Sequence, residues 1–592
     1  MSRLRADTLT DRTGTSAPDL THGATSTTGT FSGDLGGGDV TLSGNATVDG
    51  TLTYQDADNI NSTGIITAQQ GIQVLANGFD VTGISTFNSP ITVAGITTIN
   101  DSGLHATGVV TATSFAGDGS ALTGTNRTVS LVASGTLSNG QTVIVTSDGK
   151  AKAVGEEASD TPSVGTAVVF EEGITEEQGI TFDSNSNKVV VAYRDRSNSD
   201  YGTAVVGTVS GNTISFGTPV VFASANTQYC RPVFDSSNNK VVIVFSDNAN
   251  SSYGTAIVGT VSGTTISFGT EVVFESASIS SQVTATFDSN SNKVVIAYHA
   301  SGFKAIVGTV SGTSISFGSS VTIASSGTYC DSTFDTSNNK VVLAYSQNST
   351  GYGAAIVGTV SGTSISFGSE TVFESYASGH FGIAFDSSNN KVVIAYQDEQ
   401  DNYGKAIVAT VSGSSISFGT AVAFESANTD QIKATYDSAA GKVVIVYQDI
   451  DNSNYGTAIS GTVSGTSISF GTAVVFLEGN VAYPVVTYDS NANRSVIAYE
   501  NDSNSSKGTG IVYSNMGTNV TTENFIGFSD AAYSDGDTAT VQVVTALDDA
   551  QSGLTTGSQH YVQNDGTLST TAGSPSVLAG TALSDTEIIV KQ

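Results

Sequence analysis

The chain has 592 residues, which at roughly 100 to 200 residues per domain allows about three to six folded units. Acidic residues number 53 and basic residues 21, so the net charge is −32 at pH 7. A chain this acidic lacks the basic surface that nucleic-acid binding requires, and we expect no nucleic-acid partner. Only 12% of the residues are charged, while Gly (65), Phe (26) and Tyr (21) are frequent. This composition predicts a turn-rich, all-β protein rather than a disordered chain.

The N-terminal segment, residues 1–30, begins with the basic sequence MSRLR and continues with polar residues. No apolar stretch follows the basic residues, so we expect no secretion signal. No stretch of the sequence reaches the roughly 18 apolar residues that span a bilayer, and membrane insertion is not expected. The two cysteines, Cys230 and Cys330, are too few for a disulfide scaffold, and we expect both to be buried free thiols.

Residues 31–125 carry a loose repeat in which Gly is followed by Ile or Val, then any residue, then Thr. Strands this short, interrupted by Gly, do not bury a core within one chain, but several chains wound together can. We therefore expect a glycine-rich β shaft that makes the protein a homo-oligomer, and by analogy with fibrous shafts a trimer. Disorder is the alternative for this segment. The repeat occurs at residues 64–67, 83–86, 95–98 and 108–111.

Two further β modules are expected on either side of a long central array. Residues 126–163 contain TVSLVASGTLSNGQTVIVTSDGKAKAV, which predicts a hairpin-rich module, and residues 516–592 resemble it in style. In the second segment, residues 564–566 (NDG) predict a tight hairpin turn. If the array between them closes into a ring, its ends come close together, and the two modules then pack against each other.

The central array, residues 164–515, is an internal repeat. Its signature is an aromatic residue followed by Asp, then Ser or Thr, a short polar turn, a basic residue and a Val-rich strand. The signature recurs every 47 to 53 residues, and each unit holds four segments with the apolar and polar alternation of half-buried strands. The seven repeat aromatics are Phe182, Phe234, Phe287, Phe334, Phe385, Tyr436 and Tyr488.

A repeat of about 50 residues with four strands has the size of one β-propeller blade. The fourth-strand motif ISFG occurs six times after a repeat aromatic, and the last repeat lacks it. A copy of the strand that follows this motif lies instead at residues 164–170, before the first repeat. The sequence therefore predicts an all-β fold: a seven-bladed β-propeller closed by residues 164–170, with an N-terminal fibrous β shaft and a C-terminal β module. An open solenoid of the same repeats is the alternative.

Phrases at both ends of the chain resemble tail-fibre and other virion structural proteins of marine tailed phages, notably cyanophages. The resemblance covers roughly the first 125 and the last 75 residues and specifies a class of protein. It rests on MSRLRADTLTDRTGTSAPDLTHGA, LSGNATVDGTL, ATGVVTATSFAGDGSALTG and the segment that runs from ENFIGFSDAAYSDGD to SPSVLAGTALS.

The resemblance implies that residues 1–30 anchor the chain to other virion proteins and that the distal domains meet a glycan or receptor on the host surface. The protein would then be made in the host cytoplasm and be located in the virion. The propeller and the C-terminal module are both candidates for the distal tip. Adhesion without catalysis is the expected function. The alternatives are a capsid decoration without a receptor role, and a depolymerase that cleaves host glycans.

No constellation of catalytic residues is recognisable. The five histidines are scattered, with no spacing typical of metal ligands or of a catalytic triad, so no metal, cofactor or catalytic residue is expected. Most carboxylates recur with the repeat. The aspartate after each repeat aromatic is expected to cap the turn that follows it. These aspartates are Asp183, Asp235, Asp288, Asp335, Asp386, Asp437 and Asp489.

The loop between the second and third strands is the first candidate binding site. In four repeats it carries an aspartate and a tyrosine, and aromatic faces beside carboxylates suit sugar rings and their hydroxyls. Repetition around a ring would offer many weak contacts. The alternative is that each Tyr only packs over the Gly that follows it. The pairs are Asp195 and Tyr201, Asp247 and Tyr253, Asp398 and Tyr403, and Asp449 and Tyr455.

The position three residues before the repeat aromatic is the second candidate, because its residue type changes from repeat to repeat. It is charged in the second, fourth and sixth repeats, as Arg231, Asp331 and Lys433. If the first strand of each repeat lines a central channel, these side chains face either a ligand or one another. Ligand binding and a network of salt bridges are both open interpretations.

Overall fold

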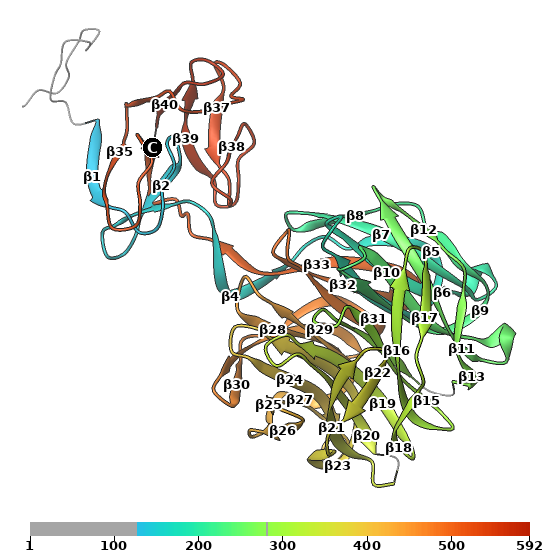
Figure 1. The fold of residues 1–592 in the computed structure, drawn as a ribbon. Coiled ribbons are helices and arrows are strands. Elements are labelled where there is room, and N and C mark those ends of the chain that lie inside the picture. Colours follow the sequence, from blue (N-terminus) through green and yellow to red (C-terminus); the bar gives the residue numbers. More distant parts are fainter. Residues whose placement is uncertain (1–126, 280–281, 348, 592) are drawn as a thin grey trace, which may run out of the picture. The chain divides into compact units, whose positions relative to one another are not determined.

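The computed structural model describes residues 127–279, 282–347 and 349–591 (Figure 1). The predicted anchor (1–30) and shaft (31–125) lie outside the described residues. The described chain is all β, with large antiparallel sheets and no α-helix. Its helical elements are the single 3₁₀ turns η1 (Arg196–Asn198), η2 (Asn248–Asn250) and η3 (Asp502–Asn504). In this part of the chain, no helix has the length and apolar character needed to cross a membrane.

Each repeat forms an antiparallel sheet around a long hairpin of its second and third strands. The second strands are β6 (Lys188–Asp195), β10 (Lys240–Asp247), β15 (Lys293–Ala300), β20 (Lys340–Gln347), β24 (Lys391–Asp398), β28 (Lys442–Asp449) and β32 (Arg494–Asn501). The third strands are β7 (Tyr201–Ser210), β11 (Tyr253–Ser262), β16 (Gly302–Ser311), β21 (Tyr352–Ser361), β25 (Tyr403–Ser412), β29 (Tyr455–Ser464) and β33 (Lys507–Thr518).

Long strands connect one repeat to the next. In β9 (Val220–Asp235), residues 220–226 pair with β7 of the first repeat and residues 227–235 pair with β10 of the second. The long strands are β5 (Val168–Asp183), β9, β23 (Thr371–Asp386), β27 (Val422–Asp437) and β31 (Val474–Asp489), with β13 (Val272–Ser278), β14 (Val283–Asp288), β18 (Val321–Ala324) and β19 (Gly327–Asp335) as divided versions. Short strands that carry the ISFG-type motif precede them: β8 (Thr213–Phe216), β12 (Thr265–Phe268), β17 (Ser314–Phe317), β22 (Ser364–Phe367), β26 (Ser415–Phe418) and β30 (Ser467–Phe470).

The turn after each repeat aromatic has the structure that its residues predict. The Asp183 carboxylate accepts hydrogen bonds from the backbone N–H groups of Asn185 (2.9 Å) and Ser186 (3.0 Å). Asn187, which ends the turn, has a φ of 54°, a left-handed conformation that Asn tolerates better than most residues. Each of the seven aspartates accepts such backbone bonds in its own repeat, which confirms the predicted turn capping.

The hydrophobic core lies between neighbouring repeats rather than within one sheet. Val190 and Val206 of the first repeat share a buried cluster with Ile243 and Phe245 of the second. Cys230 belongs to the same cluster, and both Cys230 and Cys330 are buried and free, as predicted. Because each β-branched strand face is covered by the next sheet, every repeat depends on two neighbours.

The two ends of the array share a sheet and a core. β33 of the last repeat pairs with β4 (Glu156–Val164) and also with the first residues of β5. These partner strands begin at Glu156, whereas the sequence motif marked only residues 164–170. Val496 and Val512 of the last repeat lie in one buried cluster with Val189 of the first. The first and last repeats are therefore direct neighbours.

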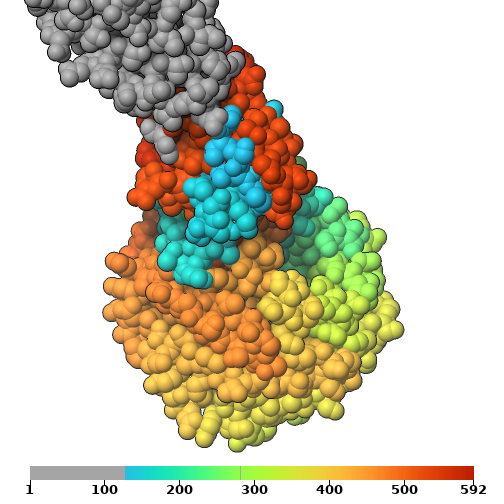
Figure 2. Space-filling view, turned by 90° about the vertical axis from the view of Figure 1, so that its left-hand side faces the viewer, coloured from blue at the N-terminus to red at the C-terminus, as the bar shows by residue number. Residues whose placement is uncertain are grey.

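Both ends of the described chain also contribute to one small β module. β2 (Thr142–Val145) pairs with β34 (Phe525–Ser529), and β1 (Thr128–Val132) pairs with β35 (Thr538–Gln542). Figure 2 shows the blue N-terminal residues lying among the red C-terminal ones in this module. Its remaining strands are β3 (Ala151–Ala153), β36 (Leu547–Asp548), β37 (Gln559–Val562), β38 (Leu568–Ser569), β39 (Val577–Ala582) and β40 (Ile588–Val590).

A buried tyrosine on the second strand links each of several repeats to the one before it. The hydroxyl of Tyr447 donates a hydrogen bond of 3.1 Å to the Glu425 carboxylate of the preceding repeat. The same Tyr–Glu contact recurs at Tyr193, Tyr298 and Tyr396. In the last repeat, Leu477 replaces the glutamate, and the buried Tyr499 hydroxyl has no partner among the described residues.

This difference predicts opposite effects for one substitution in two repeats. Tyr447→Phe removes a hydrogen bond to a carboxylate and should lower the free energy of unfolding by about 1–2 kcal/mol. Tyr499→Phe removes a buried hydroxyl that lacks a partner, so stability should be unchanged or rise by up to about 1 kcal/mol. Urea unfolding of both variants measures the difference, and equal losses in the two would contradict the pairing.

Candidate functional site

The strand register brings several loops to one edge of each sheet. Asp195, at the end of β6, pairs with Thr175 of β5 and with Tyr201 at the start of β7. We call the part of each long strand that pairs with a second strand, such as residues 175–183 of β5, the inner strand of its repeat, and the part before it the outer strand of the preceding one. Tyr201 pairs in turn with Asn226, where β9 passes from one repeat to the next. The predicted Asp–Tyr pairs and the starts of the inner strands therefore lie at the same edge.

The four predicted aspartates cap the loops at this edge. Each is at most 8% exposed, and each accepts a backbone N–H from the loop that follows it, as Asp195 does from Asn198 (3.0 Å). Asp398 also forms ion pairs with Lys405. The tyrosine partners are Tyr201, Tyr253, Tyr403 and Tyr455, all partly buried. Ligand binding at these pairs stays a prediction, and the carboxylates are already engaged by the loops.

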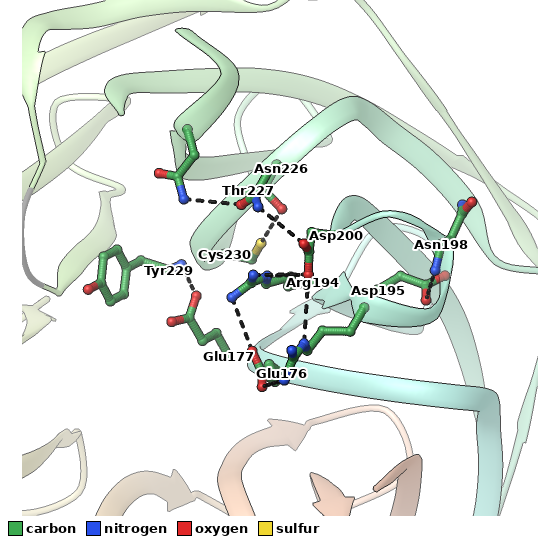
Figure 3. Close-up of polar contacts among 12 residues, drawn as sticks. Glu176, Glu177, Arg194, Asp195, Asn198, Asp200, Asn226, Thr227, Tyr229 and Cys230 are labelled. Carbon is green, nitrogen blue, oxygen red and sulfur yellow. Dashed lines mark hydrogen bonds and ion pairs between the residues drawn. The ribbon is translucent and has the colours of Figure 1, made fainter. Parts of the chain in front are cut away.

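A cluster of ion pairs lies beside the first of these loops. Figure 3 shows Arg194 between Glu176 and Asp200. The Arg194 guanidinium is 3.1 Å from the Glu176 carboxylate and 2.9 Å from that of Asp200, and its side chain is 13% exposed. Arg196 forms a second ion pair with Glu176, at 2.8 Å. The cluster fixes the start of the first inner strand.

The position five residues before the repeat aromatic has an unusual backbone. In six repeats it has a positive φ of 46° to 58°, and there the inner strand bulges away from its ladder. For large side chains this left-handed conformation is strained, and such strain clusters at functional sites. We call these residues the rim residues: Glu177, Tyr229, Tyr329, His380, Gln431 and Tyr483. The third repeat has Gln282 here, next to residues 280–281, which lie outside the description.

The rim residues contact one another from repeat to repeat. The Glu177 carboxylate accepts a hydrogen bond from the backbone N–H of Tyr229 at 2.6 Å (Figure 3). The Gln431 side chain accepts the backbone N–H of Tyr483 in the same way. The rings of Tyr329 and His380 are in contact, with their centroids 4.6 Å apart and their planes tilted by 44°. These contacts join the strained bulges of neighbouring repeats in three pairs.

The three rim tyrosines expose aromatic surface beside acidic groups. Tyr483 is 38% exposed, and Tyr229 and Tyr329 are partly buried. None of the three hydroxyls has a hydrogen-bond partner among the described residues. Burial, followed by the charges of Glu176 and Glu177, raises the pKa of Tyr483 to about 12, so its hydroxyl stays a donor at neutral pH.

The inner strands line a cavity of about 150 Å³, and Arg231, Asp331 and Lys433 all face it. The Lys433 ammonium is 3.1 Å from the Asp331 carboxylate, which is one of the two predicted arrangements. Arg231 has no ion pair within the described residues. The rim residues precede the cavity-lining residues by two or three positions on the same strands, and so lie roughly 7–10 Å away, at one end of the cavity.

Both cations of the cavity also support the bulges. Arg231 Nη1 donates to the backbone oxygen of Gln178 (3.2 Å), and Lys433 Nζ donates to that of Phe381 (2.8 Å). Each oxygen belongs to the residue after a rim residue of the preceding repeat. Gly179 lets the neighbouring strand approach this closely, because a Cβ there would lie 2.4 Å from the Cys230 backbone oxygen.

The rim was not predicted from the sequence. One signal marks it: the position five before the repeat aromatic changes from repeat to repeat and is never aliphatic, which is unlike the repeated positions around it. The charged cluster at Arg194 carries no such signal. Over the described ranges, no group of three or more His, Cys, Asp or Glu side chains is arranged to hold a metal ion.

No protein-family model and no curated protein matches the chain. Among solved structures, the chain is similar to AofleA from Arthrobotrys oligospora, at 9% identity and a TM-score of 0.37 over 54% of this chain and 95% of that one. It is also similar to the SapL1 lectin in complex with alpha methyl fucoside, at 13% identity and a TM-score of 0.35 over 52% and 98% of the two chains.

A third similar structure is the NanB sialidase from Streptococcus pneumoniae, at 11% identity and a TM-score of 0.35, covering 58% of this chain and 70% of that one. Likeness at these values is too weak to carry an argument about this chain. The function is therefore argued from its own residues.

Glu500 of the last repeat is a buried acid near the Arg194 cluster. It occupies the position at which Gln397 and Gln448 donate hydrogen bonds to Asn428 and Asn480, each on the outer strand of the same repeat. Glu500 is 5% exposed, and its Oε2 has no partner among the described residues. Burial, followed by the proximity of Asp502 and Glu176, raises its pKa to about 8.

This pKa predicts that stability falls as the pH rises. Below pH 4.5 the group is protonated in both states. Between about pH 4.5 and pH 8 only the folded state holds the proton, so the free energy of unfolding falls by about 5 kcal/mol over this interval. Glu500→Gln should abolish this loss. Urea midpoints of both proteins from pH 5 to pH 9 test the prediction, and parallel pH profiles would contradict it.

Proposed function

We propose that the chain is a non-catalytic adhesin whose repeats form a seven-bladed β-propeller that binds a surface glycan at the rim residues. The observation that carries the proposal is the rim itself. Three tyrosines with free hydroxyls lie beside carboxylate and amide side chains, at strained positions around one end of a cavity.

Three observations support a ring of repeats rather than an open solenoid. The last repeat receives its outer strands from β4 and β5, before the first repeat. The first and last repeats share a buried core cluster. One cavity is lined by inner strands of the first repeat, the last repeat and those between them, for example by Gly179 of the first and Val486 of the last. A closed ring also leaves no repeat with an uncovered apolar face.

The chemistry of the rim favours a carbohydrate ligand. A tyrosine presents an apolar ring face to the C–H groups of a sugar and a hydroxyl to its oxygens. Glu177 and Gln431 add oxygen acceptors, and His380, 2.8 Å from Asp430, adds a polar ring beside Tyr329. The side chains of the rim are positioned by their own backbone contacts, so a ligand need not order them.

A virion fibre or spike is the setting that we propose for this adhesin. Its support is the resemblance of residues 1–24, 42–52, 106–124 and 523–584 to tail-fibre and other virion proteins of marine phages. In this setting residues 1–30 anchor the chain to the virion, residues 31–125 join three copies, and the propeller meets the host surface. Location at the capsid instead of the tail would make the protein a decoration.

The rim tyrosines provide the direct test. Tyr483→Ala should weaken binding to the best ligand on a glycan array about tenfold, because it removes a stacking surface worth roughly 1–1.5 kcal/mol. Tyr561→Ala is the matched control, since Tyr561 is a partly buried tyrosine on β37 of the small β module, outside the repeat array. Equal binding by both variants would contradict a rim site, and new reducing ends in the bound glycan would contradict a non-catalytic role.

The fibre proposal makes a separate prediction about assembly. The full-length chain should have the mass of a homotrimer in solution, because the shaft segment buries its apolar residues between copies. Sedimentation velocity of the full chain, and of residues 126–592 as control, measures this. A monomeric full-length chain would contradict the shaft.

A further inference from the structure

The cavity below the rim is lined by both polar and apolar residues. The polar ones are Arg231, Lys433 and Asp331, with the hydroxyls of Thr284 and Ser332, which are 2.8 Å apart. The apolar ones include Ile180, Ile383, Val485 and Val486. A cavity of about 150 Å³ has room for several water molecules or for part of a small polar ligand.

The cavity carries a net positive charge in a chain whose total charge is −32. The Lys433 ammonium and the Asp331 carboxylate neutralise each other at 3.1 Å. Asp331 is further engaged by the Ser332 backbone N–H (2.9 Å) and by the Thr284 hydroxyl (3.3 Å). Arg231 is therefore the one cation of the cavity that forms no salt bridge among the described residues, and the nearby Glu177 carboxylate interacts with it only through space.

The Arg231 guanidinium has unused donors. Its hydrogen bonds, to the backbone oxygens of Glu177, Gln178 and Cys230, all start from Nη1. Nε and Nη2 together carry three N–H groups, and neither atom has a partner among the described residues. Both atoms remain accessible to a ligand. Parallel N–H groups of this kind match the two oxygens of a carboxylate.

We propose that this cavity is a carboxylate-binding site in which Arg231 Nε and Nη2 hold the ligand's carboxylate. The hydroxyls of Thr284 and Ser332 contact its polar substituents, and the side chains of Ile383, Val485 and Val486 contact its apolar part. The carboxylate comes from an acidic sugar or from a free small organic acid. The site goes beyond glycan binding at the rim, because a free acid fills the cavity without touching the rim tyrosines.

The test is binding of methyl glucuronide, acetate and neutral methyl glucoside to the full-length chain, followed by ligand-observed NMR and calorimetry. The two acids should bind and the neutral glucoside should not. Binding of the glucuronide alone identifies an acidic sugar as the ligand source, and comparable binding of acetate identifies a free acid. Failure of both acids to bind, or equal binding of the neutral glucoside, would overturn the proposal.

Two variants and a control connect the binding to Arg231. Arg231→Gln should weaken binding of the acid at least tenfold. Arg196→Gln is the control: it removes the same charge from a side chain that is 49% exposed outside the cavity, and it should change the affinity for the acid less than twofold. If Arg231→Gln fails to fold, Arg231→Lys keeps the charge but not the paired N–H groups, and should weaken binding about fivefold. Unchanged binding of the acid by a folded Arg231 variant would overturn the cavity site. If the same variant loses the acid but still binds the array glycan, the rim proposal stands independently.

Discussion

The pairing of β33 with both β4 and β5 is the constraint on which the rest of the repeat array depends. Each repeat takes its outer strand from the chain segment that continues into the next repeat, so an open array leaves one repeat without an outer strand. Strands 156–174 fill this place, and the core cluster around Val189 and Val496 then forms between the first and last repeats. Because every sheet has two covered faces, the inner strands are held facing one cavity.

The same continuity between repeats explains why the candidate site lies at the rim. A long strand such as β9 must leave the outer edge of one sheet and enter the inner edge of the next within a few residues. The bulge with a positive φ at Tyr229 accommodates this change of direction, and Arg231 donates a hydrogen bond to the Cys230 backbone oxygen in this bulge. Strained backbone of this kind persists only where several neighbouring contacts hold it in place. At Tyr229, one such contact is the hydrogen bond from its backbone N–H to the Glu177 carboxylate. Side-chain identity at the bulge is then free to vary, which is what a binding surface needs.

Much of the fold was predictable because its chemistry is local and repeated. The capped turn after each repeat aromatic, the alternating strands and the buried thiols of Cys230 and Cys330 follow from residue types at fixed positions. The rim was not, because a bulge is set by how two sheets meet and leaves no repeated residue type. Glu500 shows the same limit: its pKa depends on Asp502 and Glu176, which only the fold brings near it. The sheet that joins β2 to β34 depends on the meeting of chain segments almost 400 residues apart.

The central claim is that ligands bind at the rim of the repeat array. Hydrogen exchange of the full-length chain, measured with and without its best array glycan, tests this most directly because it reports on every backbone amide. We predict slower exchange at residues 176–178, 228–230, 328–330, 379–381, 430–432 and 482–484, where the inner strands bulge. Slower exchange confined to the outer strands or to residues 516–591, with the rim unchanged, would contradict the claim.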